Sequence, residues 1–163
     1  IRAATQCSGR SQTGIELWWA QGAASSGQVT ATLVSAPNSA VIAVTRYAGV
    51  APADPVVPLV TGNTNGVNGA CENAIDTATY LFNVTTTQSN SLVVGTVALR
   101  NKTHIAGSGY TTRIETSYGI AGNTAGTAIV ERPAAVATVL PLHGFLNGDV
   151  DWAIIGIELR SGP

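Results

Sequence analysis

The feature that most limits the fold is a succession of short strand-like runs, each followed by turn residues. Residues 28–35 alternate apolar side chains with threonine, which is typical of a strand with one buried face. Residues 41–47, 91–100 and 149–160 are mostly apolar, as in strands that are covered on both faces. Glycine and proline are spread along the chain and suit many turns better than one linker. The pattern predicts an all-β protein.

Composition supports this fold class. Val, Ile and Thr make up 48 of the 163 residues, whereas Leu contributes 10, Lys one and Met none. Strong helix formers other than Ala are therefore scarce. Antiparallel strands without helices predict two sheets packed face to face, and we expect a jelly-roll-like sandwich of about eight to ten strands. The expected strands are residues 14–20, 28–35, 41–47, 80–85, 91–100, 110–118, 126–131, 134–140 and 149–160.

The length fits a single domain. We expect residues 14–163 to form the sandwich and residues 1–13 to be an N-terminal segment. This segment either docks on its own domain or donates a strand to a neighbour. Residues 51–76 are expected to be a long connection rich in proline, asparagine and glycine. The chain begins at Ile1, which fits a removed leader and a trimmed chain equally well.

Charge is unusually sparse. Eight basic and nine acidic residues leave a net charge of −1, where a chain of this length would ordinarily carry about 40 charged residues. No basic field is present to attract phosphate backbones, so nucleic-acid binding is disfavoured. No apolar run is long enough to span a bilayer as a helix, so membrane insertion is not expected. With a single lysine, few charges guard the strand edges against pairing with other chains.

Cys7 and Cys71 are the two cysteines. Their spacing matches no zinc or redox motif, and an exported chain would tend to oxidise them to a disulfide. On the chain-entropy model a closed loop of this length contributes about 4 kcal/mol. Two buried free thiols, or a bond between subunits, are the alternatives.

No catalytic constellation is apparent, and we expect a protein without enzymatic activity or cofactor. His104 precedes Gly107-Ser108-Gly109, but this is not the serine-hydrolase elbow. Asp149 and Asp151 would share one strand face and could bind Ca²⁺, although an exposed strand start is the simpler interpretation. His143 lies close to them in sequence. The asparagines in residues 63–68 fit turns better than a calcium loop.

Aromatic residues could form a platform for sugars or subunits. Trp18 and Trp19 would point to opposite sides of a strand, so one of them should leave the core. That tryptophan could stack on a sugar, contact another subunit or be covered by a loop. Tyr110 and Tyr118 would share one face of an unbroken strand.

Two N-glycosylation sequons occur, at Asn83 and Asn101. Two are expected by chance in a chain with this much Ser and Thr, so their number carries no weight. Asn83 should point outward, because Tyr80, Phe82 and Val84 occupy the other set of alternating positions. Asn101 follows an expected strand. Glycans are therefore possible partners.

Three motifs follow one another along the chain. They are Arg46-Tyr47-Ala48-Gly49-Val50 with Asp54-Pro55, Ser91-Leu92-Val93-Val94-Gly95, and Trp152-Ala153 leading into Gly156-Ile157-Glu158-Leu159. This order resembles a widespread, mostly uncharacterised class of prokaryotic secreted or surface β-sandwich domains. The resemblance implies a concanavalin-like jelly roll and export from the cell, and it carries no agreed catalytic residues. The Asn/Gly stretch with Cys71 departs from the pattern.

These observations favour a structural subunit of an extracellular assembly, such as a filament, sheath, surface layer or virion coat. Copies of the same chain would cover the weakly charged surface through strand pairing and apolar contacts. The alternative is a carbohydrate-binding or adhesive module of a secreted surface protein.

Overall fold

The computed structural model describes residues 1–4, 13–22, 27–67 and 75–163. Within these residues the regular elements are eleven strands and one short 3₁₀ turn, so the all-β prediction is confirmed. The strands are β1 (Arg2–Ala4), β2 (Gly14–Glu16), β3 (Val56–Asn63), β4 (Gly66–Val67), β5 (Thr77–Thr85), β6 (Ser91–Arg100), β7 (His104–Ala106), β8 (Thr111–Tyr118), β9 (Ala125–Ala134), β10 (Val139–Val150) and β11 (Trp152–Leu159), and the 3₁₀ turn is η1 (Ala121–Asn123).

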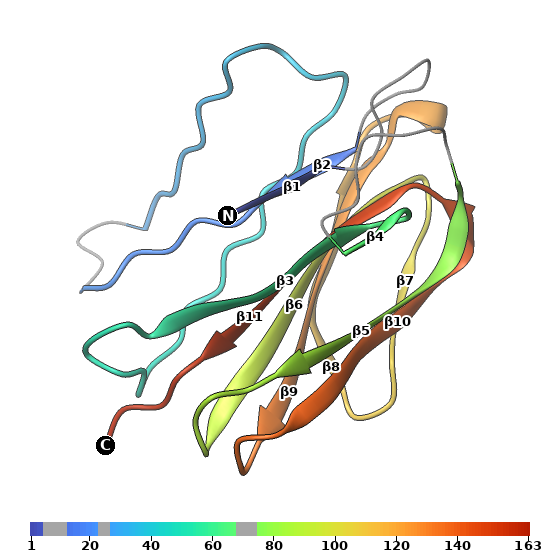
Figure 1. Ribbon diagram of the computed structural model, residues 1–163. Helices are drawn as coiled ribbons and strands as arrows, with labels where there is room; N and C mark the ends of the chain where they lie inside the picture. The colour runs from blue at the N-terminus through green and yellow to red at the C-terminus, as the bar shows by residue number, and fades with distance from the viewer. Residues whose placement is uncertain (5–12, 23–26, 68–74) are drawn as a thin grey trace.

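Two antiparallel sheets pack against each other as a β-sandwich (Figure 1). The larger has the order β4-β3-β11-β6-β9-β8 and the smaller has the order β5-β10-β7. β3 pairs with β11, β5 with β10 and β6 with β9, so each pair encloses the next one in chain order. At the centre of this order, β7 lies next to β8. Such nesting arises when one long two-stranded ribbon folds over on itself, which is the jelly-roll arrangement.

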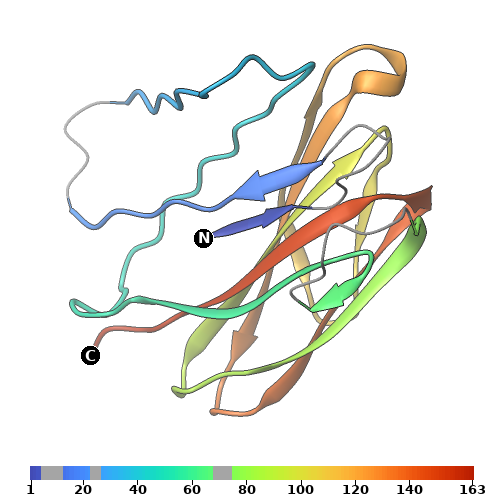
Figure 2. The ribbon, with the colours of Figure 1, turned by 45° about the horizontal axis from the view of Figure 1, so that its top comes forward.

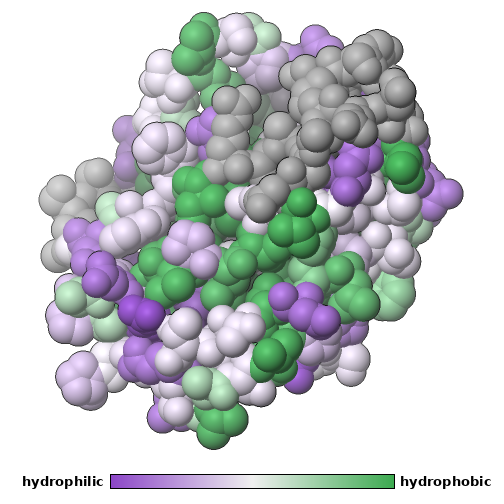
Figure 3. Space-filling view, viewed as in Figure 1, coloured by the Kyte–Doolittle hydropathy of each residue, from purple (hydrophilic) through white to green (hydrophobic). Residues whose placement is uncertain are grey.

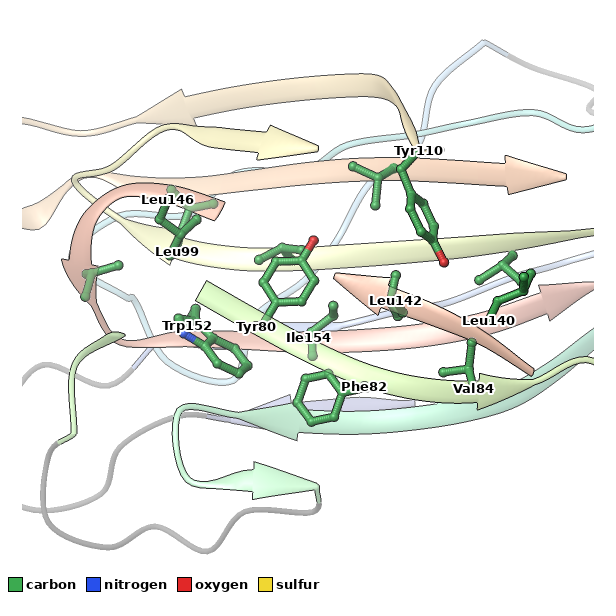
Figure 4. Packing of buried hydrophobic residues seen from close by; sticks show 14 of the residues in the cluster. Tyr80, Phe82, Val84, Leu99, Tyr110, Leu140, Leu142, Leu146, Trp152 and Ile154 are labelled. Atoms are coloured by element: carbon green, nitrogen blue, oxygen red, sulfur yellow. The ribbon is translucent and has the colours of Figure 1, made fainter. Parts of the chain in front are cut away.

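The main core lies between the two sheets (Figure 4). β5 contributes Tyr80, Phe82 and Val84 by strict alternation, as the sequence predicts. β10 contributes Leu142, which has no exposed surface. Trp152 from β11 packs against Tyr80 and Phe82, with ring centroids 5.7 and 6.0 Å away. These contacts join the small sheet to the large one.

The larger sheet also has an apolar outer face, made by Val94, Ile129, Ala153, Ile155, Ile157 and Leu159. Residues 1–4, 13–22 and 39–48, which we call the outer layer, cover it. β1 pairs with β2, and Ile15 and Leu17 pack on the apolar face together with Ala43 and Tyr47. Figure 2 shows β1 and β2 lying across this sheet. Residues 1–4 therefore lie on their own domain, whereas residues 5–12 of the expected N-terminal segment are outside the described residues.

Three expected strands are absent. Residues 28–35 and 41–47 belong to no strand, and residues 134–140 contain the turn between β9 and β10. Conversely, β3 and β4 lie inside the expected connection 51–76, and β7 and most of β10 were not expected. The strands that contain Pro58 and Pro141 were missed because proline usually interrupts a strand pattern.

Candidate functional site

The candidate site is a surface rather than a cleft, and it begins at the two adjacent tryptophans. Trp18 is 85% exposed and Trp19 is 52% exposed. The expectation that one of them would be buried is wrong. β2 ends at Glu16, and the alternation of half-buried and exposed side chains stops at Trp18, so Trp19 is exposed as well. Trp18 Nε1 donates a hydrogen bond to Glu16 Oε2 at 3.1 Å, which holds the indole at the surface. Both rings are available for contact.

Residues 27–38, which we call the arm, follow these tryptophans along the chain. Each arm residue is exposed, and Figures 1 and 2 both show the arm standing away from the two sheets. Val29 and Leu33 are more than half exposed, and Val34 is fully exposed. Within the described residues, the arm makes no backbone hydrogen bond to another backbone group. Irregular stretches of this length in compact domains commonly carry function.

Residues 41–47 connect the arm to the sandwich in an extended, alternating conformation. Val41, Ala43, Thr45 and Tyr47 are half-buried, whereas the intervening side chains are exposed. Ile42 and Val44 are each 54% exposed. The sequence indicates a strand covered on both faces, but this chain covers one face only. An apolar row is consequently presented to the outside.

One polar cluster fastens this segment to the larger sheet. Tyr47 Oη donates a hydrogen bond to Glu131 Oε1 at 2.5 Å. Arg113 forms a two-pronged ion pair with the same carboxylate, with Nη2 2.7 Å and Nε 3.0 Å from Oε2. Glu131 is buried, and a buried carboxylate needs such partners to remain ionised. The cluster therefore explains why residues near Tyr47 stay on the sheet while the arm does not.

The cluster shifts the pKa values of its members. Burial raises the pKa of Tyr47 to about 12, and the hydrogen bond to Glu131 adds to this shift. Burial works to raise the pKa of Glu131, but the hydrogen bonds from Arg113 and Tyr47 outweigh it, and the pKa lies below its usual value. At neutral pH the tyrosine is thus a neutral donor to an ionised carboxylate. The arrangement is structural, because no proton is exchanged near pH 7.

The edges of the sheets differ in how they are protected. β8, at one edge of the larger sheet, carries Arg113 and Glu115 and has a register shift between Thr112 and Ile114. β3 carries Pro58 near the other edge and is partly paired with β4. β7 has only three residues. β5 is nine residues long, forms an edge of the smaller sheet and contains no charge, proline or glycine. Charge, proline and bulges are the usual protection against edge pairing.

Figure 3 shows hydrophobic residues gathered around the middle of the face seen in Figure 1, with hydrophilic residues mostly toward the margins. On the outer face of the smaller sheet, Phe145 of β10 lies opposite Ile105 of β7, and both are about half exposed. Leu81 of β5 is 65% exposed, and its partner in β10 is His143. Apolar side chains therefore emerge on both sides of the sandwich.

The two sequon asparagines are exposed. Asn83 lies on the outer face of β5, so its predicted direction is confirmed. Asn101 has a positive φ of 55° in the turn after β6, and its Oδ1 accepts a hydrogen bond from the Thr124 amide at 2.9 Å. Both side chains can be reached from solvent.

The residues weighed for metal binding do not form one open site. Asp149 is exposed near the end of β10, whereas Asp151 is fully buried at the corner between β10 and β11. The expectation that they share one strand face is wrong, because the chain changes sheets between them. Among the described residues, no group of three His, Cys, Asp or Glu side chains is arranged to hold a metal ion. Cys7, Cys71 and Asn68 lie outside the described residues.

The remaining candidates have structural surroundings. Tyr110 is buried, whereas Tyr118 is 71% exposed. The register shift in β8 breaks the alternation that would have placed them on one face. His104 is buried, its Nε2 lies 2.9 Å from Tyr80 Oη, and burial lowers its pKa. His143 lies edge-on to Tyr110, with ring centroids 6.1 Å apart.

Two polar hollows lie beside the only lysine, Lys102. The larger, of about 450 Å³, is lined by side chains that include Thr103, Glu115 and Thr127. The smaller, of about 290 Å³, is bordered by Asn101, Asn147 and Ser117. Hydroxyl, amide and charged groups of this kind can bind water or sugar hydroxyls. No helix among the described residues is long and apolar enough to cross a membrane.

Sequence reasoning missed the Tyr47–Glu131–Arg113 cluster and the arm. Glu131 offered a signal, since it is a lone carboxylate in a strand otherwise made of small and apolar residues up to Val130. Buried charges in such runs are paired in folded proteins. The arm offered none, because its alternation is that of an ordinary strand.

This geometry defines a jelly-roll β-sandwich with a third, partly unpaired layer on one face. Comparison with family models, curated proteins and solved structures finds no match for this chain.

Proposed function

We propose that this protein is a non-enzymatic structural subunit that assembles with copies of itself. The observation that carries the proposal is a set of exposed apolar side chains on the outer layer and arm, at residues that belong to no strand in the described part of the chain. It consists of Trp18, Trp19, Val29, Leu33, Val34, Ile42 and Val44. A second copy could cover these side chains and pair their backbone at the same time.

Sparse charge supports the same proposal. Seventeen charged residues, from eight basic and nine acidic, leave little electrostatic repulsion between copies. Some of these charged groups already have partners within the fold. Glu131 is paired with Arg113, and Glu158 accepts hydrogen bonds from the β5–β6 turn. The partner in this proposal is the chain itself, not nucleic acid or membrane.

The proposed setting is outside the cell, in a filament, sheath, surface layer or virion coat. The order of motifs resembles secreted or surface jelly-roll domains, and two exposed sequons could carry sugar. A disulfide between Cys7 and Cys71 belongs to the same proposal. Glycans or disulfides would supply hydration or stability that the sparse charge does not.

Negative-stain electron microscopy of the purified chain tests the proposal. We expect ordered particles much larger than one subunit. The double variant Ile42→Asp/Val44→Asp places two charges on the exposed row and should raise the concentration needed for assembly at least tenfold. Val136→Asp changes an exposed valine in the β9–β10 turn and serves as the control. Isolated particles of one subunit at every concentration would contradict the proposal.

A carbohydrate-binding or adhesive module is the second candidate, and the exposure of both tryptophans favours it. Indole faces can stack on the apolar faces of sugar rings. In this case a stable monomer should be retained on immobilised polysaccharide, and Trp18→Ala or Trp19→Ala should abolish retention. Retention unchanged in both variants would exclude a tryptophan platform.

A further inference from the structure

The arm has the sequence of a strand, but it pairs with no strand in the described part of the chain. Residues 28–35 read Gln-Val-Thr-Ala-Thr-Leu-Val-Ser, with Val29, Ala31 and Leu33 alternating with Thr30 and Thr32. The segment contains no charge, proline or glycine. All its side chains are exposed, and its backbone makes no hydrogen bond to another backbone group in the described part of the chain. Its pattern therefore fits a sheet that this copy does not provide.

One sheet edge of the same molecule has no neighbouring strand among the described residues. Within the described residues, β5 pairs only with β10, so one side of its backbone ladder is free. Its inward residues Tyr80, Phe82 and Val84 are apolar. Its outer face is mixed and exposes Thr79, Leu81, Asn83 and Thr85. β8 and β3 are guarded by charges, a register shift or proline, and β7 is too short. β5 is thus the most receptive edge.

We propose that residues 28–35 of one copy add to the free edge of β5 in the next copy. The two segments are similar in length, uncharged and alternate in the same way. Val29, Ala31 and Leu33 can extend the core side beside Phe82, while Thr30 and Thr32 continue the outer face beside Asn83 and Thr85. The added strand forms backbone hydrogen bonds that neither segment makes alone. Because donor and acceptor are different surfaces, the contact repeats head to tail and builds an open polymer.

This inference rests on the proposed self-assembly and names the surfaces that perform it. Ala31→Pro tests the donor, because proline removes one amide donor from the arm without breaking a backbone hydrogen bond in the isolated chain. Asn38→Pro, at the end of the arm and outside residues 28–35, is the matched control. By sedimentation velocity, Ala31→Pro should raise the concentration for half-assembly at least tenfold and Asn38→Pro less than threefold. Equal assembly of both variants with wild type would overturn the inference and leave self-assembly standing.

Photo-crosslinking tests the acceptor. A benzophenone amino acid replaces Thr32 in isotopically heavy chains, which are mixed with light chains and irradiated. Heavy-to-light crosslinks should map to residues 77–85. Crosslinks to β8, or crosslinks only within one chain, would overturn the inference. If wild type itself never assembles, the proposed function fails and this inference fails with it.

Discussion

Glu158 of β11 is a fully buried carboxylate that organises the turn between β5 and β6. Its oxygens accept hydrogen bonds from the amides of Thr87 and Gln88 at 3.0 Å and from the Thr87 hydroxyl at 2.7 Å. Burial works to raise the pKa of this carboxyl, but these bonds outweigh burial and lower the pKa. The residue therefore fixes the β5–β6 turn against the end of β11.

We expect Glu158→Gln to lower the free energy of unfolding by about 2 kcal/mol, since charge-assisted bonds to the turn are lost. A lowered pKa in the folded state means that the carboxylate stabilises the protein above its unfolded pKa, and this contribution disappears as pH falls through the folded value. The variant should consequently lose less stability than wild type between about pH 5 and pH 2. Urea unfolding across this range measures both effects, and parallel pH profiles would contradict them.

Gly95 and Gly156 are cross-strand partners in β6 and β11. A methyl group at Gly95 would lie 2.8 Å from Leu142 Cδ1, and one at Gly156 would lie 2.7 Å from Cδ2. The glycine pair makes room for Leu142, which the small sheet inserts between the strands. Close packing, not backbone freedom, explains these glycines.

Gly95→Ala should lower the free energy of unfolding by about 1–3 kcal/mol through overpacking. Leu142→Ala alone should cost about 2–5 kcal/mol. Because the two changes share one space, the double variant should be more stable than the sum of the single effects. Denaturant unfolding of the three variants completes the cycle, and strict additivity would show that the two side chains do not compete.

At the scale of elements, the outer layer depends on a small number of contacts. Ala43 and Tyr47 pack on the larger sheet, and Tyr47 adds the hydrogen bond to Glu131. The backbone of residues 41–47 makes no ladder with any described strand. This element should therefore open locally before the sandwich unfolds.

Tyr47→Phe removes the hydroxyl that ties this element to Glu131. We expect local opening to become about fivefold more frequent, equivalent to about 1 kcal/mol. Arg46 is exposed, so the rate of trypsin cleavage after Arg46 reports the opening. Tyr118→Phe alters an exposed tyrosine and should cleave at the wild-type rate. An unchanged rate in Tyr47→Phe would show that packing alone holds the segment.

The sequence predicted some elements well and others poorly, for physical reasons. Residues 91–100 match β6 to the residue, because an apolar run bounded by turns identifies a central strand. β10 contains Pro141, Gly144 and Gly148, which look like turn residues. Gly144 is needed because an added side chain would meet Tyr80 and His104. Tertiary packing therefore outweighs local propensity here.

The sequence predicted that the candidate surface would be apolar and exposed, but it did not predict which segments would form it. Sparse charge and the adjacent tryptophans indicated an exposed apolar surface, which the structure places on the outer layer and arm. The sequence could not reveal that residues 28–35 pair with none of the described strands, because their alternation is the same whether a partner belongs to this chain or to another. Pairing is a property of the whole sheet.

At the scale of the whole molecule, the fold is complete between the two sheets and incomplete on the outer layer. β6 and β11 are almost fully buried, and the nested strand pairs close the core. The arm adds no side chain to that core, and one edge of β5 has no partner strand among the described residues. Under the proposed self-assembly, contacts between copies would account for their uncharged sequences.

Light scattering after size-exclusion chromatography tests this account most directly. The mass of the unmodified chain is measured over a wide range of concentration at moderate ionic strength. We predict a mass that rises with concentration to many multiples of 16.6 kDa. A mass that stays at that of one chain, even at the highest concentration, would contradict the account.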